Sequence, residues 1–255
     1  MSYWQALILG FVQGITEFLP ISSSGHLVII QNWLQINPPP IDFDLFLHLV
    51  SLIVIIYFFR NILRSINRQM IVSLFLATIP LGIVGLLLKD SLELIYETNI
   101  VVGFGLIFTG LLNFRAAKLF LEKNLSSSIS NQDALKIGFF QALATIPGVS
   151  RSGSTLFGAS LCKVSKNKAF EFSFLLAIIA ILLSNIGQIL LSSDCSIHSL
   201  LNHHWTIYLA GGATCFIFSL VGLKLVKATL DNAKYHFFGW YCIIIGFLTI
   251  LLSLF

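Results

Sequence analysis

Charged residues are scarce in this sequence. Asp, Glu, Lys and Arg make up 10% of its 255 residues, whereas 56% of the residues are hydrophobic. A soluble domain carries roughly 25% charged residues. Because so few charges cannot cover a water-exposed surface, the composition excludes an ordinary soluble protein and predicts an integral membrane protein.

Paired cysteines and a basic leader are also missing. The four cysteines lie too far apart in the sequence to form a ligand-spaced pair. The first 16 residues hold no Lys or Arg, and the first apolar run contains Gln13 and Glu17. A secretory signal has a basic start and an uninterrupted apolar stretch, so we expect none here.

Long apolar runs, in contrast, are abundant. A helix needs about 20 apolar residues to cross the hydrocarbon core of a bilayer, and six segments come close to that length. These six predicted spans are 43–59, 71–88, 99–114, 170–191, 206–223 and 237–255.

Two further apolar stretches at the start of the chain are too short to cross. As helices, 3–18 and 26–34 would be about 24 Å and about 13 Å long at 1.5 Å per residue. Pro20 and three serines interrupt the run between them. We therefore predict a re-entrant helical hairpin over 3–34. Its non-helical tip must line a cavity or pack against protein, because lipid cannot satisfy the backbone there.

The second half of the sequence repeats this pattern, with a predicted hairpin over 134–163. At a constant offset of 128 residues the polar positions of the two hairpins coincide. The matching pairs are Gln13 with Gln141, Ser22 with Ser150, Ser24 with Ser152, and Gly25 with Gly153. We predict a duplication: a first repeat at 1–125 and a second at 133–255, each a re-entrant hairpin plus three transmembrane helices. The fold class is all-α, with about ten helices in one integrated membrane domain.

The basic residues predict the topology. Three spans are an odd number, so the second repeat is inverted relative to the first. If the first hairpin enters from the outer face, the inner loops carry most of the Lys and Arg, as the positive-inside rule requires. Those residues are Arg60, Arg64, Arg68, Arg115, Lys118, Lys123, Lys136, Lys163, Lys166, Lys168, Lys224, Lys227 and Lys234. The two hairpins then enter from opposite faces, and their tips can meet.

The polar residues of the two tips are the candidate site. They are Gln13, Glu17, Ser22, Ser23, Ser24, His26, Ser150, Arg151, Ser152 and Thr155. An ionisable group inside a membrane costs about 2.5–3.5 kcal/mol on insertion scales and is a functional candidate by default. The alternative is that Glu17 and Arg151 only form a structural ion pair, which leaves the serines and His26 without a role. His48 lies inside a predicted span, where it either faces this site or bonds a neighbouring helix.

The residue types at the tips suit a phosphate group. Helix N-termini offer free N–H groups to anions, and an arginine offers a bidentate fork. A serine beside a histidine can act as a nucleophile, and Glu17 and His26 add acid–base or metal-binding capacity. From the residues alone, we expect either chemistry on a lipid phosphate or diphosphate, or transport of one.

Two motifs give the sequence a family resemblance. "QGITEFLPISSSGHL" (13–27) and "PGVSRSGST" (147–155) resemble the motifs of the undecaprenyl-diphosphate phosphatases, the bacitracin-resistance proteins, and the resemblance runs nearly end to end. Gln13 departs from the pattern, because many members carry Glu there. That departure weakens the expectation of a metal site with two carboxylates.

The resemblance implies an enzyme that hydrolyses undecaprenyl diphosphate to undecaprenyl phosphate and so recycles a lipid carrier for cell-wall synthesis. It implies that Glu17, Ser23, His26 and Arg151 are catalytic, with Ser23 or an activated water as nucleophile and His26 as the acceptor of its proton. Gln13 and the remaining tip residues, namely Ser22, Ser24, Ser150, Ser152 and Thr155, would bind substrate. It also implies a divalent cation, Mg²⁺ or Ca²⁺, which Glu17 and Gln13 would hold; the alternative is that Glu17 orients His26.

The resemblance places the protein in the bacterial inner membrane, with the site open to the outer, periplasmic face. The expected partners are the polyprenyl diphosphate and membrane lipids, with no nucleic acid, and a homodimer is compatible with the sequence. The competing function is a transporter or flippase of a polyprenyl phosphate or another anionic lipid, because inverted repeats with broken helices describe many transporters. Pure transport would need no nucleophile.

Overall fold

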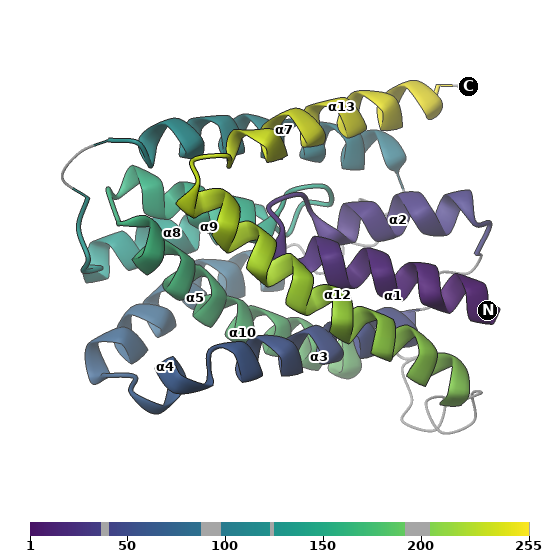
Figure 1. Cartoon of the computed structure of the whole chain (residues 1–255), viewed down its shortest axis with the longest axis horizontal. Coiled ribbons are helices and arrows are strands. Elements are labelled where there is room, and N and C mark those ends of the chain that lie inside the picture. The colour runs from purple at the N-terminus through teal and green to yellow at the C-terminus, as the bar shows by residue number, and fades with distance from the viewer. Residues whose placement is uncertain (37–40, 88–97, 123–124, 192–204, 255) are drawn as a thin grey trace.

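The apolar runs of the sequence fold into helices (Figure 1). The computed structural model describes residues 1–36, 41–87, 98–122, 125–191 and 205–254. Within these residues the chain forms eleven helices and one isolated β-bridge, between Ser126 and Val164. The all-α class predicted from the sequence is confirmed.

The helices of the first half are α1 (Tyr3–Phe18), α2 (Ser23–Trp33), α3 (Ile41–Phe58), α4 (Arg60–Arg64), α5 (Arg68–Leu87) and α7 (Asn99–Leu119). Those of the second half are α8 (Asn131–Leu143), α9 (Arg151–Leu161), α10 (Lys166–Leu191), α12 (Trp205–Asp231) and α13 (His236–Leu252).

Five of these helices are long and apolar enough to cross a membrane, namely α3, α5, α7, α10 and α12. The sixth predicted span forms α13, an apolar helix of 17 residues. The chain is therefore a multi-pass membrane protein. Positions 88 and 255, at the ends of two predicted spans, lie outside the described residues. The sequence did not predict α4, because five residues with two arginines show no apolar period.

The first helix of each hairpin begins with the same cap. Ser2 and Gln5 form a capping box at the start of α1, and Ser130 and Asp133 form one at the start of α8. A capping box satisfies two backbone N–H groups that a helix start leaves free. Both pairs are related by the offset of 128 residues found in the sequence.

Each of these first helices packs against a span of the other half. α1 lies along α12, where a Cβ on Gly14 would come within 2.5 Å of the carbonyl oxygen of Cys215. α8 lies along α5, where a Cβ on Gly138 would overlap the carbonyl of Ala77. Small residues let membrane helices approach closely. Each first helix thus packs against the other half of the chain, as expected if the two halves are copies of each other. The boundaries of the two repeats, 1–125 and 133–255, stay a prediction.

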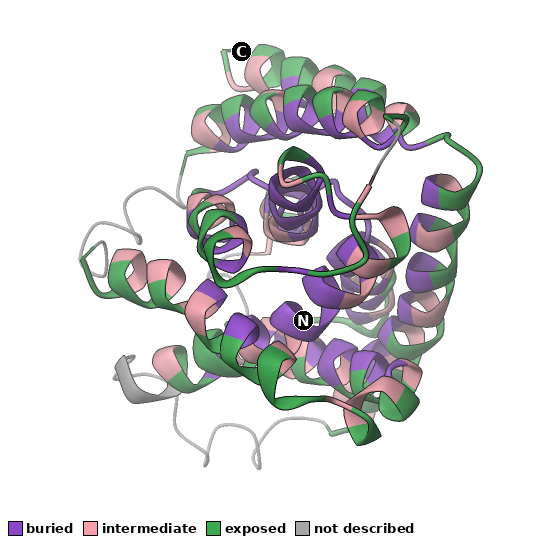
Figure 2. Cartoon of the chain, turned by 90° about the vertical axis from the view of Figure 1, so that its left-hand side faces the viewer, coloured by how far each residue is buried: buried purple, intermediate pink, exposed green. Residues whose placement is uncertain are grey.

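The helices turn one face to the interior and another to the surroundings. Seen nearly end-on in Figure 2, their buried faces point inward and their exposed faces outward. The outward faces carry large apolar side chains; Phe75, Phe104 and Phe247 are each more than half exposed. Water does not favour such a surface, whereas lipid tails do. The bundle therefore presents an apolar periphery to the bilayer.

Candidate active site

The two helical hairpins meet at their tips. α1 and α2 lie on the right of Figure 1, α8 and α9 lie on the left, and both connecting turns face the middle. Ser152 Oγ donates a hydrogen bond of 3.0 Å to the carbonyl oxygen of Leu19 in the other tip. A Cβ on Gly25 would lie 3.1 Å from Cα of Gly148. The two tips that the sequence predicted therefore contact each other.

Helix α7 holds both tips from one side. Asn113 Nδ2 donates to the carbonyl oxygen of Pro20 in the first tip at 2.6 Å. One turn earlier, Thr109 Oγ1 donates to the carbonyl of Gly148 and accepts from the N–H of Ser150, each at 2.9 Å. A buried non-helical backbone needs such partners, because no lipid group can replace them. Two polar side chains of an otherwise apolar span thus fix the tips relative to each other.

Glu17 is the centre of the polar contacts. Its side chain is 4% exposed, and its Oε2 accepts hydrogen bonds from Ser23 Oγ at 2.6 Å and from Gln13 Nε2 at 3.0 Å. Gln13 and Glu17 share one helix face, as their spacing of four residues predicts. Ser23 reaches the same carboxylate because it opens α2 at the far side of the tip.

Arg151 brings the second hairpin to this carboxylate. Its Nη2 lies 2.6 Å from Glu17 Oε1, and its side chain is 16% exposed. The arginine is the first residue of α9, whose start is capped by Ser150 through the N–H of Gly153. The ion pair between Glu17 and Arg151, which the sequence analysis gave as a purely structural alternative, is therefore present. Ser23 and Gln13, however, bond the same carboxylate. An ion pair that serves only to join the halves would not need them.

His48 also faces the site from α3. Its Nε2 lies 3.7 Å from Glu17 Oε2, and its Nδ1 donates to the carbonyl oxygen of Asp44 at 2.7 Å. The sequence left open whether this histidine faces the cavity, and the structure places it there.

His26 lies near the first tip but is not paired with Ser23 in the described contacts. Its Nδ1 donates to the carbonyl of Ser22 at 2.7 Å, and its Nε2 lies 2.8 Å from the hydroxyl of Tyr241. Ser23 Oγ donates to Glu17 instead. The reason is local: His26 is four residues after Ser22, so its ring folds back onto the carbonyl of the first turn. In this arrangement Glu17, rather than His26, is the acceptor next to the Ser23 hydroxyl.

Ser22 adopts an unusual backbone conformation for a residue with a side chain. Its φ is +71°, and its hydroxyl accepts from the N–H of Gly25 to cap α2. A non-glycine residue in this region costs about 1–3 kcal/mol and persists only where its surroundings hold it. The turn that presents Ser23 is therefore strained, and contacts with the surrounding residues hold it in place.

The remaining predicted substrate-binding residues bond within the tips. Ser24 pairs with Ser22, and Ser150 pairs with Ser152 while it caps α9 through the N–H of Gly153. Thr155 is fully buried and bonds Ser173 on α10 as well as the backbone of its own helix. Among the described contacts none of these hydroxyls reaches Glu17. Their substrate role stays a prediction.

Two neighbouring groups have the right chemistry for a hard cation. Mg²⁺ and Ca²⁺ prefer oxygen ligands, and Mg²⁺ commonly uses one or two protein groups together with substrate phosphates. Gln13 Oε1 is buried and has no hydrogen-bond partner, and the carboxylate of Glu17 lies beside the same side chain. The described residues hold no group of three or more His, Cys, Asp or Glu that could bind a metal without such help.

Comparison with known proteins identifies the relatives of this chain. Residues 6–248 match the sequence model of the family described as bacitracin resistance protein BacA. The chain belongs to this family. An undecaprenyl-diphosphatase of Methanococcus maripaludis (strain C6) is 35% identical over 259 residues, which cover 97% of this chain and 99% of the relative. Undecaprenyl-diphosphatases of Halothermothrix orenii and Alkaliphilus metalliredigens are each 32% identical, with at least 99% of both chains covered.

Sequence reasoning missed three members of this BacA-family site. Thr109 and Asn113 are each fully buried in an apolar span, and Tyr241 contacts His26 from α13. A polar side chain inside a predicted span is the signal that could have found Thr109 and Asn113. No spacing rule connects positions 26 and 241, because only the fold brings them together.

Proposed function

We propose that this protein hydrolyses undecaprenyl diphosphate to undecaprenyl phosphate and inorganic phosphate, and so returns a lipid carrier to cell-wall synthesis. The family and the names of its relatives support this function. One observation carries the proposal: the carboxylate of Glu17 bonds a serine hydroxyl on one side and an arginine on the other. A nucleophile, its base and a phosphate-binding fork thus stand within one site.

In the first step, Ser23 Oγ attacks the terminal phosphorus of the diphosphate. The serine proton passes to Glu17 Oε2, which already accepts it at 2.6 Å. The new bond joins Oγ to phosphorus, and the bond between this phosphorus and the bridging oxygen breaks. Undecaprenyl phosphate leaves and takes the proton from Glu17, so atoms and charges balance.

In the second step, water attacks the phosphoserine. Glu17 accepts a proton from the water and returns one to Ser23 Oγ as the bond between oxygen and phosphorus breaks. The products are inorganic phosphate and the original serine. If water attacks the diphosphate directly instead, Glu17 would remain the base, and Ser23 would only help to bind the diphosphate.

Arg151 supports the charge that develops on the phosphoryl oxygens. In the described contacts it uses Nη2 for Glu17, and its planar fork can offer further N–H groups to phosphate. Gln13 and Glu17 would hold the divalent cation, which would neutralise charge on the diphosphate oxygens. Such electrostatic help is the largest contribution in many phosphoryl transfers.

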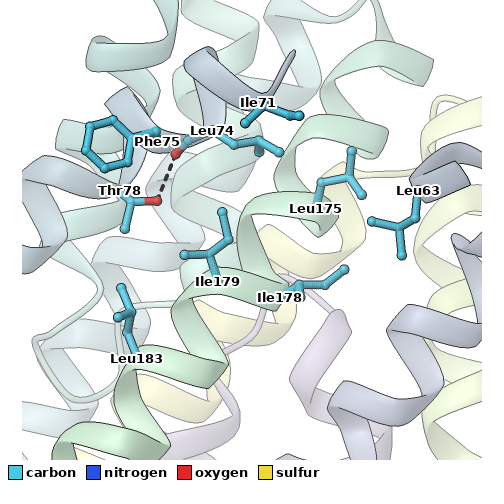
Figure 3. Close-up of a pocket in the computed structure, with 9 residues that line it drawn as sticks. All are labelled: Leu63, Ile71, Leu74, Phe75, Thr78, Leu175, Ile178, Ile179 and Leu183. Atoms are coloured by element: carbon cyan, nitrogen blue, oxygen red, sulfur yellow. Dashed lines mark hydrogen bonds between the residues drawn. The ribbon is translucent and has the colours of Figure 1, made fainter. Parts of the chain in front are cut away.

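The polyprenyl tail needs an apolar path from the site into the bilayer. An apolar pocket of about 490 Å³ lies between α5 and α10, where the only polar side chain, Thr78, bonds the carbonyl of its own helix (Figure 3). A second pocket, of about 370 Å³, lies between α5 and α8 and reaches Thr145 and Ile146 at the second tip. We place the start of the tail in this second pocket, because its lining includes Thr145 and Ile146 of the loop that leads to Arg151.

We further propose that the protein resides in the bacterial inner membrane with its site open to the outer face. The support comes from the charges: most of the Lys and Arg lie in loops that this orientation puts inside. A substrate diphosphate on the outer leaflet would then reach the tips without crossing the membrane.

The test is release of inorganic phosphate from undecaprenyl diphosphate by the purified full-length protein in detergent, compared with an Arg151→Ala variant. Stoichiometric phosphate and undecaprenyl phosphate from the wild type are expected, with a large loss in the variant. The competing transporter function predicts a different result in vesicles: the labelled lipid would change leaflets while its diphosphate stays intact.

A further inference from the structure

His26 has hydrogen-bond partners on both ring nitrogens. Nδ1 lies 2.7 Å from the carbonyl oxygen of Ser22, and Nε2 lies 2.8 Å from the hydroxyl of Tyr241. The Tyr241 and His26 rings are nearly parallel, at 9°, with their centroids 5.6 Å apart. Tyr241 belongs to α13, so this contact joins the last helix of the chain to the first hairpin.

These partners determine which nitrogen carries the proton. A carbonyl oxygen only accepts, so Nδ1 must be the donor toward Ser22. In the neutral imidazole Nε2 then carries a lone pair, and the Tyr241 hydroxyl can donate a hydrogen bond to it. A histidine held in this way has no free nitrogen for the hydroxyl of Ser23.

The carbonyl that His26 holds belongs to the strained residue of the tip. Ser22 has a φ of +71°, and its carbonyl also accepts from the backbone N–H of His26 at 3.2 Å. Ser23 follows directly and points its hydroxyl at Glu17. The His26 ring is therefore one of the contacts that hold the turn from which Ser23 bonds Glu17.

We propose that Tyr241 is a positioning residue for the hydrolysis: it fixes the tautomer and orientation of His26, which in turn holds the Ser22 turn that presents Ser23. The inference rests on the proposed function and adds to it, because it gives His26 a role other than that of the base. The outer partners of metal-bound histidines change metal affinity or activity by about 10- to 100-fold when they are mutated, and we expect a loss of similar size here.

The first test is Tyr241→Phe, which keeps the ring and removes the hydroxyl. We expect kcat to fall about 10- to 100-fold with little change in KM, since the diphosphate contacts remain. Tyr57→Phe is the matched control: Tyr57 is exposed and its ring packs against Arg60, so the activity of this variant should match the wild type. Wild-type kcat in Tyr241→Phe would overturn the proposal.

The second test compares His26→Asn with His26→Gln. The Asn amide can place an N–H near the position of Nδ1, and the longer Gln amide can place one near Nε2. Because the proposal gives Nδ1 the essential contact, Asn should retain at least about 10-fold more activity than Gln, a difference of one strong contact. Greater activity in His26→Gln would contradict the proposal. So would an equal loss in both variants, which is what a base at Nε2 predicts because neither amide can accept a proton.

The third test does not depend on turnover. ¹⁵N NMR of histidine-labelled protein should show one imidazole protonated at Nδ1 with a hydrogen-bonded, unprotonated Nε2. This signal should be absent in His26→Asn and shifted in Tyr241→Phe. An Nε2-protonated His26 in the wild type would overturn the inference even if phosphate release is normal. If the wild type releases no phosphate, the proposed function is wrong, and the NMR experiment still decides which nitrogen of His26 carries the proton.

Discussion

Arg151 and Glu17 form an ion pair between the two halves of the chain, with Nη2 of the arginine 2.6 Å from Oε1 of the carboxylate. The two residues are 134 positions apart in sequence, and each belongs to one hairpin tip. Because Ser23 and Gln13 bond the other oxygen of the same carboxylate, this pair orients the carboxylate that accepts the hydrogen bond of Ser23.

Replacement of Arg151 by lysine tests the charge geometry. An ammonium keeps the charge but cannot reproduce the planar fork of a guanidinium. We expect Arg151→Lys to lose about 10²- to 10³-fold in kcat, as for the loss of one strong transition-state contact. The measurement is steady-state phosphate release. Arg115→Lys, at an exposed position of α7, is the control and should be unaffected. Near-normal turnover in Arg151→Lys would remove Arg151 from the phosphate site.

Gln13→Glu tests the proposed cation ligands. A second carboxylate next to Glu17 would repel it without a cation and would bind a divalent ion more tightly. We expect the Mg²⁺ or Ca²⁺ concentration at half-maximal activity to fall by about 10-fold, with loss of activity in chelator. Gln69→Glu, at the N-terminal end of α5, is the control, because Gln69 bonds Asn131 at the start of α8 and not a tip residue. An unchanged cation dependence in Gln13→Glu would place the cation elsewhere.

Thr109→Val tests whether α7 positions the two tips. Valine has the shape of threonine but leaves the N–H of Ser150 without its acceptor, which should cost about 1–3 kcal/mol of stability. We expect a lower thermal midpoint and reduced kcat. Thr249→Val is the matched control, because the Thr249 hydroxyl bonds only the carbonyl of Ile245 in its own helix. Equal effects of the two variants would mean that the tip contact has no special role.

Cysteine labelling tests the inverted topology. On a background without other cysteines, single cysteines at positions 65 and 165 should react from the same, cytoplasmic, face. Both positions lie next to arginine or lysine residues that the positive-inside rule places inside. A cysteine at position 195, which lies outside the described residues, should react from the outer face. Reaction of 65 and 165 from opposite faces would exclude the inverted repeat.

Much of this arrangement follows from short-range rules. The lengths of the apolar runs predicted the spans, and the interruption at Pro20 predicted the first hairpin, because a helix of about 24 Å cannot cross about 30 Å of hydrocarbon. The spacing of Gln13 and Glu17 predicted their shared face. Arg151 was placed near them only through the match between the two halves.

The partners of the site residues could not be predicted in the same way. Ser23 lies within reach of both Glu17 and His26 along the chain, and the sequence favoured His26. The choice depends on the direction of one imidazole ring, which Ser22 and Tyr241 determine from opposite sides. Tyr241 is 215 residues away, and only the packing of α13 brings it there.

The most direct test of the account is to trap phosphate on the enzyme. Undecaprenyl diphosphate labelled in its terminal phosphate would be mixed with purified protein, and the reaction would be quenched within the first turnover. We predict label on Ser23, identified by mass spectrometry of the peptide that contains it. Ser23→Ala should bind substrate, acquire no label and release almost no phosphate, while Ser65→Ala should behave as the wild type. Substantial turnover by a well-folded Ser23→Ala protein would contradict the account.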